Sequence, residues 1–79
     1  MRKRKEERLV VSFHTTTDAV AMRALGKSAG LRGRMIPVPR QISAGCGLAW
    51  SEPADNADAL HRAIESHTLE YEAITPLEL

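Results

Sequence analysis

Two helical segments alternate with four short strand-like runs along this chain, and this order constrains the fold more than any other feature of the sequence. The runs are rich in apolar and β-branched residues, as strands are; they are Leu9–Phe13, Arg34–Ile36, Leu48–Ser51 and Tyr71–Thr75. Helices are predicted between them, at about Thr16–Ala29 and Ala54–Ser66. The predicted order of elements is therefore βαββαβ.

Both helices have recognisable ends. Thr15 and Asp18 have the spacing of a capping box, in which the hydroxyl accepts from an early amide and the carboxylate lies in the first turn. Gly30 supplies the left-handed residue that commonly ends a helix. The second helix follows Pro53, and Asp55 in its first turn suits the positive end of the helix dipole.

Right-handed crossovers turn this order into a ferredoxin-like α+β sandwich of two layers, with an antiparallel sheet in the order 4-1-3-2. The end of the first strand, the start of the first helix and the connection between strands two and three then meet at one edge of the sheet. One face of the sheet carries no helix. Val10, Met35 and Trp50 would make part of that face apolar, which predicts a partner surface or weak homo-oligomers.

A chain of 79 residues has room for one domain. We expect residues 9–75 to form it, with residues 1–8 as a flexible charged N-terminal tail and residues 76–79 as a C-terminal tail. A single cysteine cannot form an internal disulfide, which favours a reducing compartment and hence the cytoplasm. No apolar run approaches the length of a membrane span. With one cysteine and no clustered carboxylates, we expect no metal site and no cofactor.

Charge is distributed unevenly along the chain. Residues 1–40 contain ten Lys/Arg and three Asp/Glu, whereas residues 41–79 contain one and seven. A basic face would suit an anionic partner such as RNA. We favour the interpretation that the two halves fold together and neutralise each other. The strands also lack an array of stacking aromatic residues, so nucleic acid is the least favoured partner.

The connection between the second and third strands is the most informative segment. It is longer than the roughly 2–5 residues that a hairpin loop needs. Pro39 stiffens its first part, and Gly45 and Gly47 flank Cys46, so that backbone amides can approach the sulfur closely. This setting suits a presented thiolate, the reactive form of cysteine. The alternative is that Cys46 packs as a small hydrophobic residue.

Several residues are expected near Cys46. His14, Thr15 and Thr16 lie at the same predicted edge of the sheet. His14 could pair with the thiol, as in Cys–His nucleophiles, although a surface histidine is the simpler interpretation. Arg40 lies six residues before Cys46 in the same loop and would support the thiolate electrostatically.

A further group of residues carries a resemblance to a known family; they are Phe13, Thr15, Thr16, Ala19, Arg34–Arg40, Ile42, Ser43 and Cys46–Ala49. From Val10 to about Ile74 the chain resembles the selenium/sulfur carrier-protein-like domains of bacteria. The segment from Ile36 through Gly47 is the most specific part. Two positions depart from the pattern, since an acidic residue is common at Arg23 and a larger residue is usual at Gly26.

The resemblance implies that Cys46 accepts a sulfur or selenium atom, as a persulfide or selenosulfide, and passes it to a partner. It also implies a donor of the cysteine desulfurase type and an acceptor of unknown identity. A carrier is favoured over a stand-alone enzyme, because so small a domain can hardly build a full active-site cleft. The competing interpretation is a regulatory or protein-interaction module in which the cysteine only packs.

Overall fold

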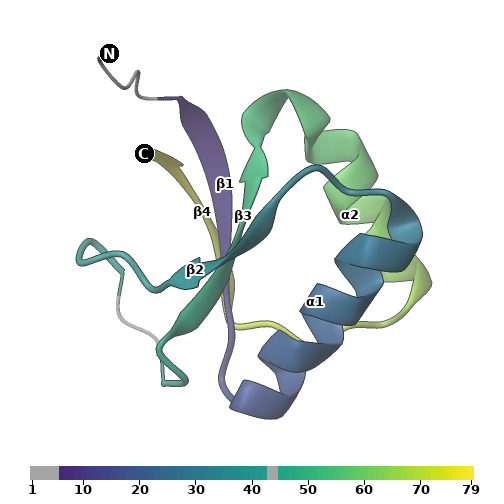
Figure 1. Ribbon diagram of the computed structural model, residues 1–79, viewed down its shortest axis with the longest axis horizontal. Coiled ribbons are helices and arrows are strands. Elements are labelled where there is room, and N and C mark those ends of the chain that lie inside the picture. Colours follow the sequence, from purple (N-terminus) through teal and green to yellow (C-terminus); the bar gives the residue numbers. More distant parts are fainter. Residues whose placement is uncertain (1–5, 43–44) are drawn as a thin grey trace.

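The sheet has the strand order that the sequence predicts. The structure is a computed structural model that describes residues 6–42 and 45–79. Four antiparallel strands pair in the order β2-β3-β1-β4, which is the expected order read from the other edge. Both helices lie on one side of this sheet (Figure 1). The elements are β1 (Glu7–Ser12), α1 (Thr16–Ala29), β2 (Arg34–Pro37), β3 (Leu48–Pro53), η1 (Ala54–Asn56), α2 (Ala57–Ser66) and β4 (Ala73–Glu78).

The first helix has both of its predicted ends. The Thr15 side chain accepts a hydrogen bond from the Asp18 amide at 3.1 Å, as an N-cap residue does. Gly30 ends the helix in the left-handed conformation, with φ 72°, and its N–H donates to the carbonyl of Gly26. These local signals position the start of α1 directly after β1.

The second helix starts one turn later than predicted. The first three residues of the expected helix form the short 3-10 helix η1, and α2 itself begins at Ala57. The Asn56 side chain makes no capping bond, because it donates instead to the carboxylate of Glu52 at 2.7 Å. The buried face of α2 consists of Leu60, Ala63 and Ile64.

The pairing of β1 with β4 reaches further along both strands than expected. The expectation that the last strand ends before Pro76 is wrong, since β4 continues to Glu78 and Pro76 lies opposite Leu9. Glu6 and Leu79 exchange two backbone hydrogen bonds of 2.9 and 3.0 Å. Hydrogen-bonded and non-hydrogen-bonded pairs alternate along an antiparallel ladder, so the pair of Pro76 with Leu9 is a non-hydrogen-bonded one. The nitrogen of Pro76 therefore faces away from β1, and the missing N–H group of proline costs no hydrogen bond between the strands. Residues 6–8 and 76–79 therefore extend the ladder, and the rest of the expected N-terminal tail lies outside the described residues.

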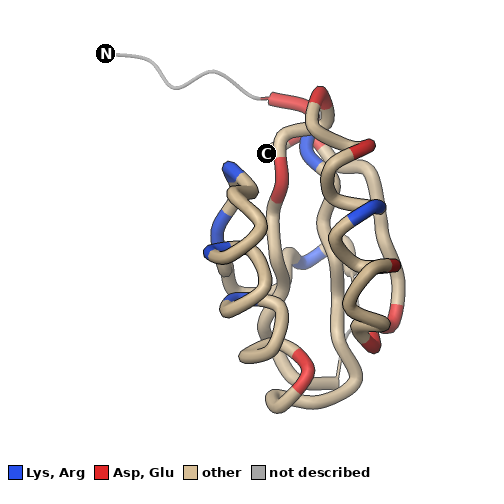
Figure 2. Tube along the Cα trace, turned by 90° about the vertical axis from the view of Figure 1, so that its right-hand side faces the viewer, with Lys and Arg blue, Asp and Glu red and all other residues tan. Residues whose placement is uncertain are grey.

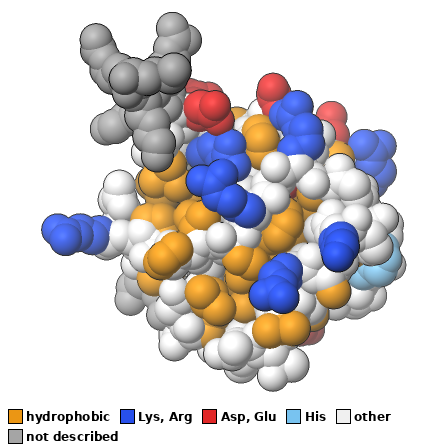
Figure 3. All heavy atoms as spheres, viewed as in Figure 1, with side chains coloured by type: hydrophobic (Ala, Val, Ile, Leu, Met, Phe, Trp, Pro, Cys, Tyr) orange, Lys and Arg blue, Asp and Glu red, His pale blue; other side chains and the backbone are white. Residues whose placement is uncertain are grey.

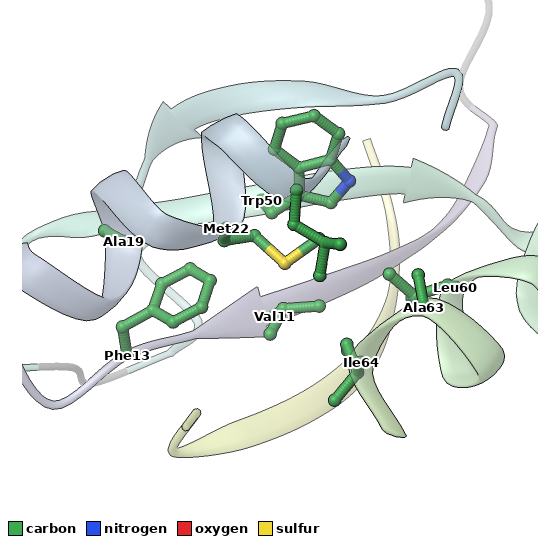
Figure 4. Close-up of a cluster of buried hydrophobic side chains, with 9 residues drawn as sticks. Val11, Phe13, Ala19, Met22, Trp50, Leu60, Ala63 and Ile64 are labelled. Atoms are coloured by element: carbon green, nitrogen blue, oxygen red, sulfur yellow. The ribbon is translucent and has the colours of Figure 1, made fainter. Parts of the chain in front are cut away.

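The core lies between the sheet and the two helices. Phe13, Met22 and Leu60 are fully buried there, and Val11 and Trp50 join them from the middle of the sheet (Figure 4). The sequence placed Trp50 on the open face of the sheet together with Met35. That placement is wrong, because both residues pack into the helix-facing core. Of the expected apolar residues on the open face, Val10 alone is there, adjacent to the core residue Val11 on β1.

A buried carboxylate joins the α1–β2 connection to β3 and η1. Glu52 is fully buried, and its two oxygens accept four hydrogen bonds. The donors are the backbone amides of Arg32 and Gly33, the indole N–H of Trp50 and the side-chain amide of Asn56, at 2.7–2.9 Å. One side chain thereby holds the α1–β2 connection to β3 and to η1, which follows β3 directly.

Gly26 in the middle of α1 makes room for Trp50. A Cβ atom at Gly26 would lie 2.4 Å from the indole Cη2 atom. In an exposed helix, alanine is more favourable than glycine by about 1 kcal/mol. Here the clash should outweigh that gain, so Gly26→Ala is expected to lower the free energy of unfolding by about 1–3 kcal/mol.

Denaturant unfolding of the Gly26→Ala protein measures this effect. Ala24, which is exposed on the same helix, provides the matched control. Ala24→Gly should cost about 1 kcal/mol, the ordinary price of a helical glycine. A Gly26→Ala protein as stable as the original, or more stable, would show that the Trp50 ring can move aside.

Candidate functional site

Cys46 lies in the loop that joins β2 to β3. The ladder continues briefly into this loop, since the Val38 amide donates to the Gly47 carbonyl at 2.9 Å. A turn then follows, in which the Ile42 amide donates to the Pro39 carbonyl at 2.9 Å. In Figure 1 this part of the loop projects from the sheet on the side away from the helices. Ser43, which contributed to the resemblance, lies outside the described residues.

The Cys46 sulfur is held by the backbone of Leu48. The thiol donates to the Leu48 carbonyl at 3.3 Å, and the Leu48 amide donates to the sulfur at 3.4 Å. Because the Val38–Gly47 pair is hydrogen-bonded, alternation directs the amide and carbonyl of Leu48 away from β2 and toward β1. The last pair between β1 and β3 is Ser12 with Ala49. Because β1 has ended at this point, the amide and the carbonyl of Leu48 have no partner on a neighbouring strand. The Cys46 sulfur forms hydrogen bonds with both groups instead.

The two glycines beside Cys46 have different roles. Gly47 adopts φ 77°, a left-handed conformation that other residues enter only with strain. Gly45 lies against the β1–α1 connection, because a Cβ atom on it would be 3.1 Å from the His14 carbonyl oxygen. The cysteine loop and the residues just before α1 are thus in contact, as the topology predicted. This contact places Cys46 at the edge of the sheet where α1 begins.

The polar residues expected around Cys46 do not bind its sulfur in the described structure. The His14 side chain is exposed, and its Nδ1 atom lies 3.8 Å from a carboxylate oxygen of Glu72. Thr15 caps α1, while Thr16 is the first residue of that helix and is exposed. Arg40 occupies the turn between Pro39 and Ile42 and is exposed. The sequence missed the role of Leu48, since a backbone contact leaves no signal in residue identity.

Cys46 is half-buried and packs against the edge of the hydrophobic core. The residue is therefore neither sealed in the interior nor fully exposed. An amide donor can stabilise a sulfur anion, whereas the Leu48 carbonyl accepts only from a protonated sulfur. The arrangement thus accommodates the resting thiol and supplies one N–H donor to a thiolate or persulfide.

Charge is separated in the folded domain rather than neutralised. Figure 2 shows Lys and Arg along α1 and mainly Asp and Glu along α2. Among the described residues, the ion pair of Arg32 with Asp55 joins the basic half of the sequence to the acidic half, and His14 and Glu72 form a second contact of this kind if the histidine is protonated. Among the described residues, most charges of the two halves therefore form no direct ion pair across the halves.

The described ranges contain neither a helix that could span a membrane nor a cluster of metal ligands. None of the helices there is both long and apolar enough to cross a membrane. No three His, Cys, Asp or Glu side chains in residues 6–42 and 45–79 are grouped so that they could hold a metal ion.

The fold and the loop define a small α+β domain with a single half-buried cysteine beside the N-terminus of a helix. Residues 8–76 match the family described as "Putative Se/S carrier protein-like", and the chain belongs to this family. The comparison with curated proteins and the comparison with solved structures each found no match.

Proposed function

We propose that the protein is a sulfur or selenium carrier and that Cys46 is the atom-carrying residue. The observation that carries this proposal is the half-buried Cys46, whose sulfur accepts a hydrogen bond from the Leu48 amide at the edge of the sheet. Membership of the Se/S carrier-like family supports it. We also propose that the domain is ferredoxin-like, on the basis of its element and strand order.

Loading is a thiol exchange at sulfane sulfur. The Cys46 thiolate attacks the terminal sulfur of a persulfide on the donor, so that an S–S bond forms at Cys46 and the donor's S–S bond breaks. The donor leaves as a thiolate, and Cys46 becomes a persulfide with no net oxidation or reduction. Selenium follows the same course if the donor presents a selenosulfide. Delivery is the same exchange with the acceptor's nucleophile.

The contacts of Leu48 suit both states of this cycle. In the resting thiol, the S–H group donates to the Leu48 carbonyl and the sulfur accepts from the Leu48 amide. In the persulfide, the inner sulfur has no proton but still accepts from that amide. Gly47 has open space where a Cβ atom would be, so no side chain at that position crowds the added atom.

A carrier acts between two proteins. We propose a donor of the cysteine desulfurase type, which generates protein persulfides, and an acceptor that uses the transferred atom. A single carrier thiol stays reduced, and so ready to be loaded, in a compartment that lacks disulfide-forming machinery. We therefore propose the cytoplasm as its location.

Intact-mass analysis tests the proposal directly. After brief exposure to glutathione persulfide, the protein should gain the mass of one sulfur atom, because Cys46 is its single cysteine. The addition should disappear on treatment with dithiothreitol, which reduces persulfides. Peptide mapping should place it on Cys46. A protein that gains no mass, or gains mass that dithiothreitol does not remove, would contradict the proposal.

Packing of Cys46 against the core favours a second candidate function, a protein-interaction module in which the thiol has no chemistry. Alkylation separates the two. A carrier thiol should react with iodoacetamide in the native protein at least as fast as glutathione does at neutral pH. A thiol that reacts only after denaturation would favour the interaction module.

A further inference from the structure

A groove lies on the flank of α1, apart from the Cys46 loop. It has a volume of about 330 Å³ and is bounded by α1, β2 and β3. Its floor is formed by the apolar side chains of Leu31, Met35 and Trp50. Its rim carries three cations: Arg23 and Lys27 from α1, and Arg34 from β2. Figure 3 shows Lys and Arg side chains around exposed hydrophobic ones on this face of the molecule.

The three rim cations have no anionic partner among the described residues. The ion pairs in that part of the chain are Arg8 with Glu6, His14 with Glu72 and Arg32 with Asp55. Arg23, Lys27 and Arg34 are all exposed. Three positive charges around an apolar floor repel one another, and an anionic ligand with an apolar part would relieve this repulsion while covering the floor.

We propose that this groove docks an acidic segment of a partner protein, with an apolar side chain on the floor and carboxylates on the three rim cations. This inference deepens the proposed function and rests on it, since the partner would be the donor or the acceptor of the carried atom. The surface of α2, where acidic residues predominate, has the wrong charge for such a segment (Figure 2).

The shape of the groove favours a protein segment over a small molecule or RNA. Its rim is exposed and Leu31 and Met35 are only half-buried, so it is open to solvent. Small-molecule sites usually enclose about 70–90% of the ligand surface. RNA readers offer aromatic faces to bases, whereas the Trp50 residue is 4% exposed and its ring packs against Gly26.

The groove is close to the sulfur along β3. Leu48, whose backbone holds the Cys46 sulfur, lies two residues before Trp50 on that strand. At about 3.3 Å per residue this separation is about 7 Å along the strand. The groove and the Cys46 loop thus adjoin the same strand, so a partner that extends beyond the groove along β3 can reach both. Arg23 and Gly26 both line this groove.

A displayed library of short random peptides tests the inference. The bait is the full Cys46→Ser chain, so the result does not depend on the thiol. We expect enriched peptides to place Asp or Glu on both sides of an apolar residue. Trp50 is the single tryptophan, and its fluorescence should change on titration with a synthetic selected peptide. Raising the salt concentration should weaken binding.

Paired variants locate the binding site. Reversing charge with R23E/K27E should weaken binding at least about tenfold, because attraction to the acidic peptide becomes repulsion. Arg62→Glu on α2 removes a cation that is not part of the groove lining and should leave the affinity unchanged. Circular dichroism checks that both variants are folded.

Several outcomes would overturn the inference. They are a library without enriched peptides, enriched peptides without acidic residues, and equal binding by R23E/K27E. Displacement of the peptide by a short RNA oligonucleotide of higher affinity, or by inorganic phosphate alone at similar concentration, would also overturn it. None of these outcomes bears on persulfide loading, which is measured by mass on the protein with its thiol intact.

Discussion

Replacing Cys46 by serine is expected to abolish sulfur loading while leaving the fold intact. A hydroxyl cannot hold a sulfane sulfur under these conditions, and the chain contains no second cysteine to substitute for it. The serine oxygen can still donate to the Leu48 carbonyl and accept from the Leu48 amide, which are the two bonds that the sulfur makes now. The stability cost should therefore be about 1 kcal/mol or less.

Mass spectrometry after exposure to glutathione persulfide gives the first readout, and a thermal melt gives the second. The expected pair of results is no added sulfur and a nearly unchanged melting temperature. Retained loading in Cys46→Ser would show that sulfur associates without the thiol. A serine protein that fails to fold would instead show that Cys46 serves packing, as the interaction-module interpretation holds.

The bounds of α1 followed from the sequence, whereas Pro53 and Asp55 did not define the start of α2, because residues 54–56 form η1. Thr15 and Gly30 fixed α1 at the predicted residues, because a cap and a left-handed glycine act within one turn of the helix. The predicted end of the last strand at Thr75 was wrong, because a proline can continue a strand that is at an edge of the sheet if its nitrogen faces away from the neighbouring strand. Those facts belong to the assembled sheet rather than to the local sequence.

The face of β3 that carries Trp50 was also predicted incorrectly. Leu48 and Trp50 are large and apolar, and Ala49 and Ser51 are small, so alternation alone indicates that the first pair shares one face. Placing Trp50 on the open face ignored that pattern. The space for its ring is provided by Gly26, because a Cβ atom at that position would overlap the indole.

The candidate site was predictable in its position but not in its contacts. Topology alone brought the Cys46 loop to the start of α1, and the Gly45–His14 contact agrees with it. The sequence offered Arg40 and His14 as partners of the sulfur, whereas the described contacts come from the backbone of Leu48. The basic groove escaped notice because its three cations come from two elements that are adjacent only in the folded chain.

The burial of Glu52 was not predicted either, because acidic residues are rarely buried and nothing in the local sequence marks Glu52 as an exception. Its removal should have the largest effect on stability of any single substitution considered for this chain. Glu52→Ala leaves four donors without their acceptor in or near the interior. At about 1–3 kcal/mol for each buried group left unsatisfied, the loss should be about 4 kcal/mol or more.

A domain of 79 residues has a total free energy of unfolding of about 4–12 kcal/mol, so Glu52→Ala should be largely unfolded or close to it at 37 °C. Glu52→Gln keeps one accepting oxygen and should lose less, about 2–3 kcal/mol. Glu65→Ala, at an exposed position on α2, should change stability by about 0.5 kcal/mol at most. Urea unfolding followed by Trp50 fluorescence ranks the three variants. A Glu52→Ala protein that unfolds at the same urea concentration as Glu65→Ala would mean that water replaces the carboxylate, and that this buried network does not hold the α1–β2 connection to β3.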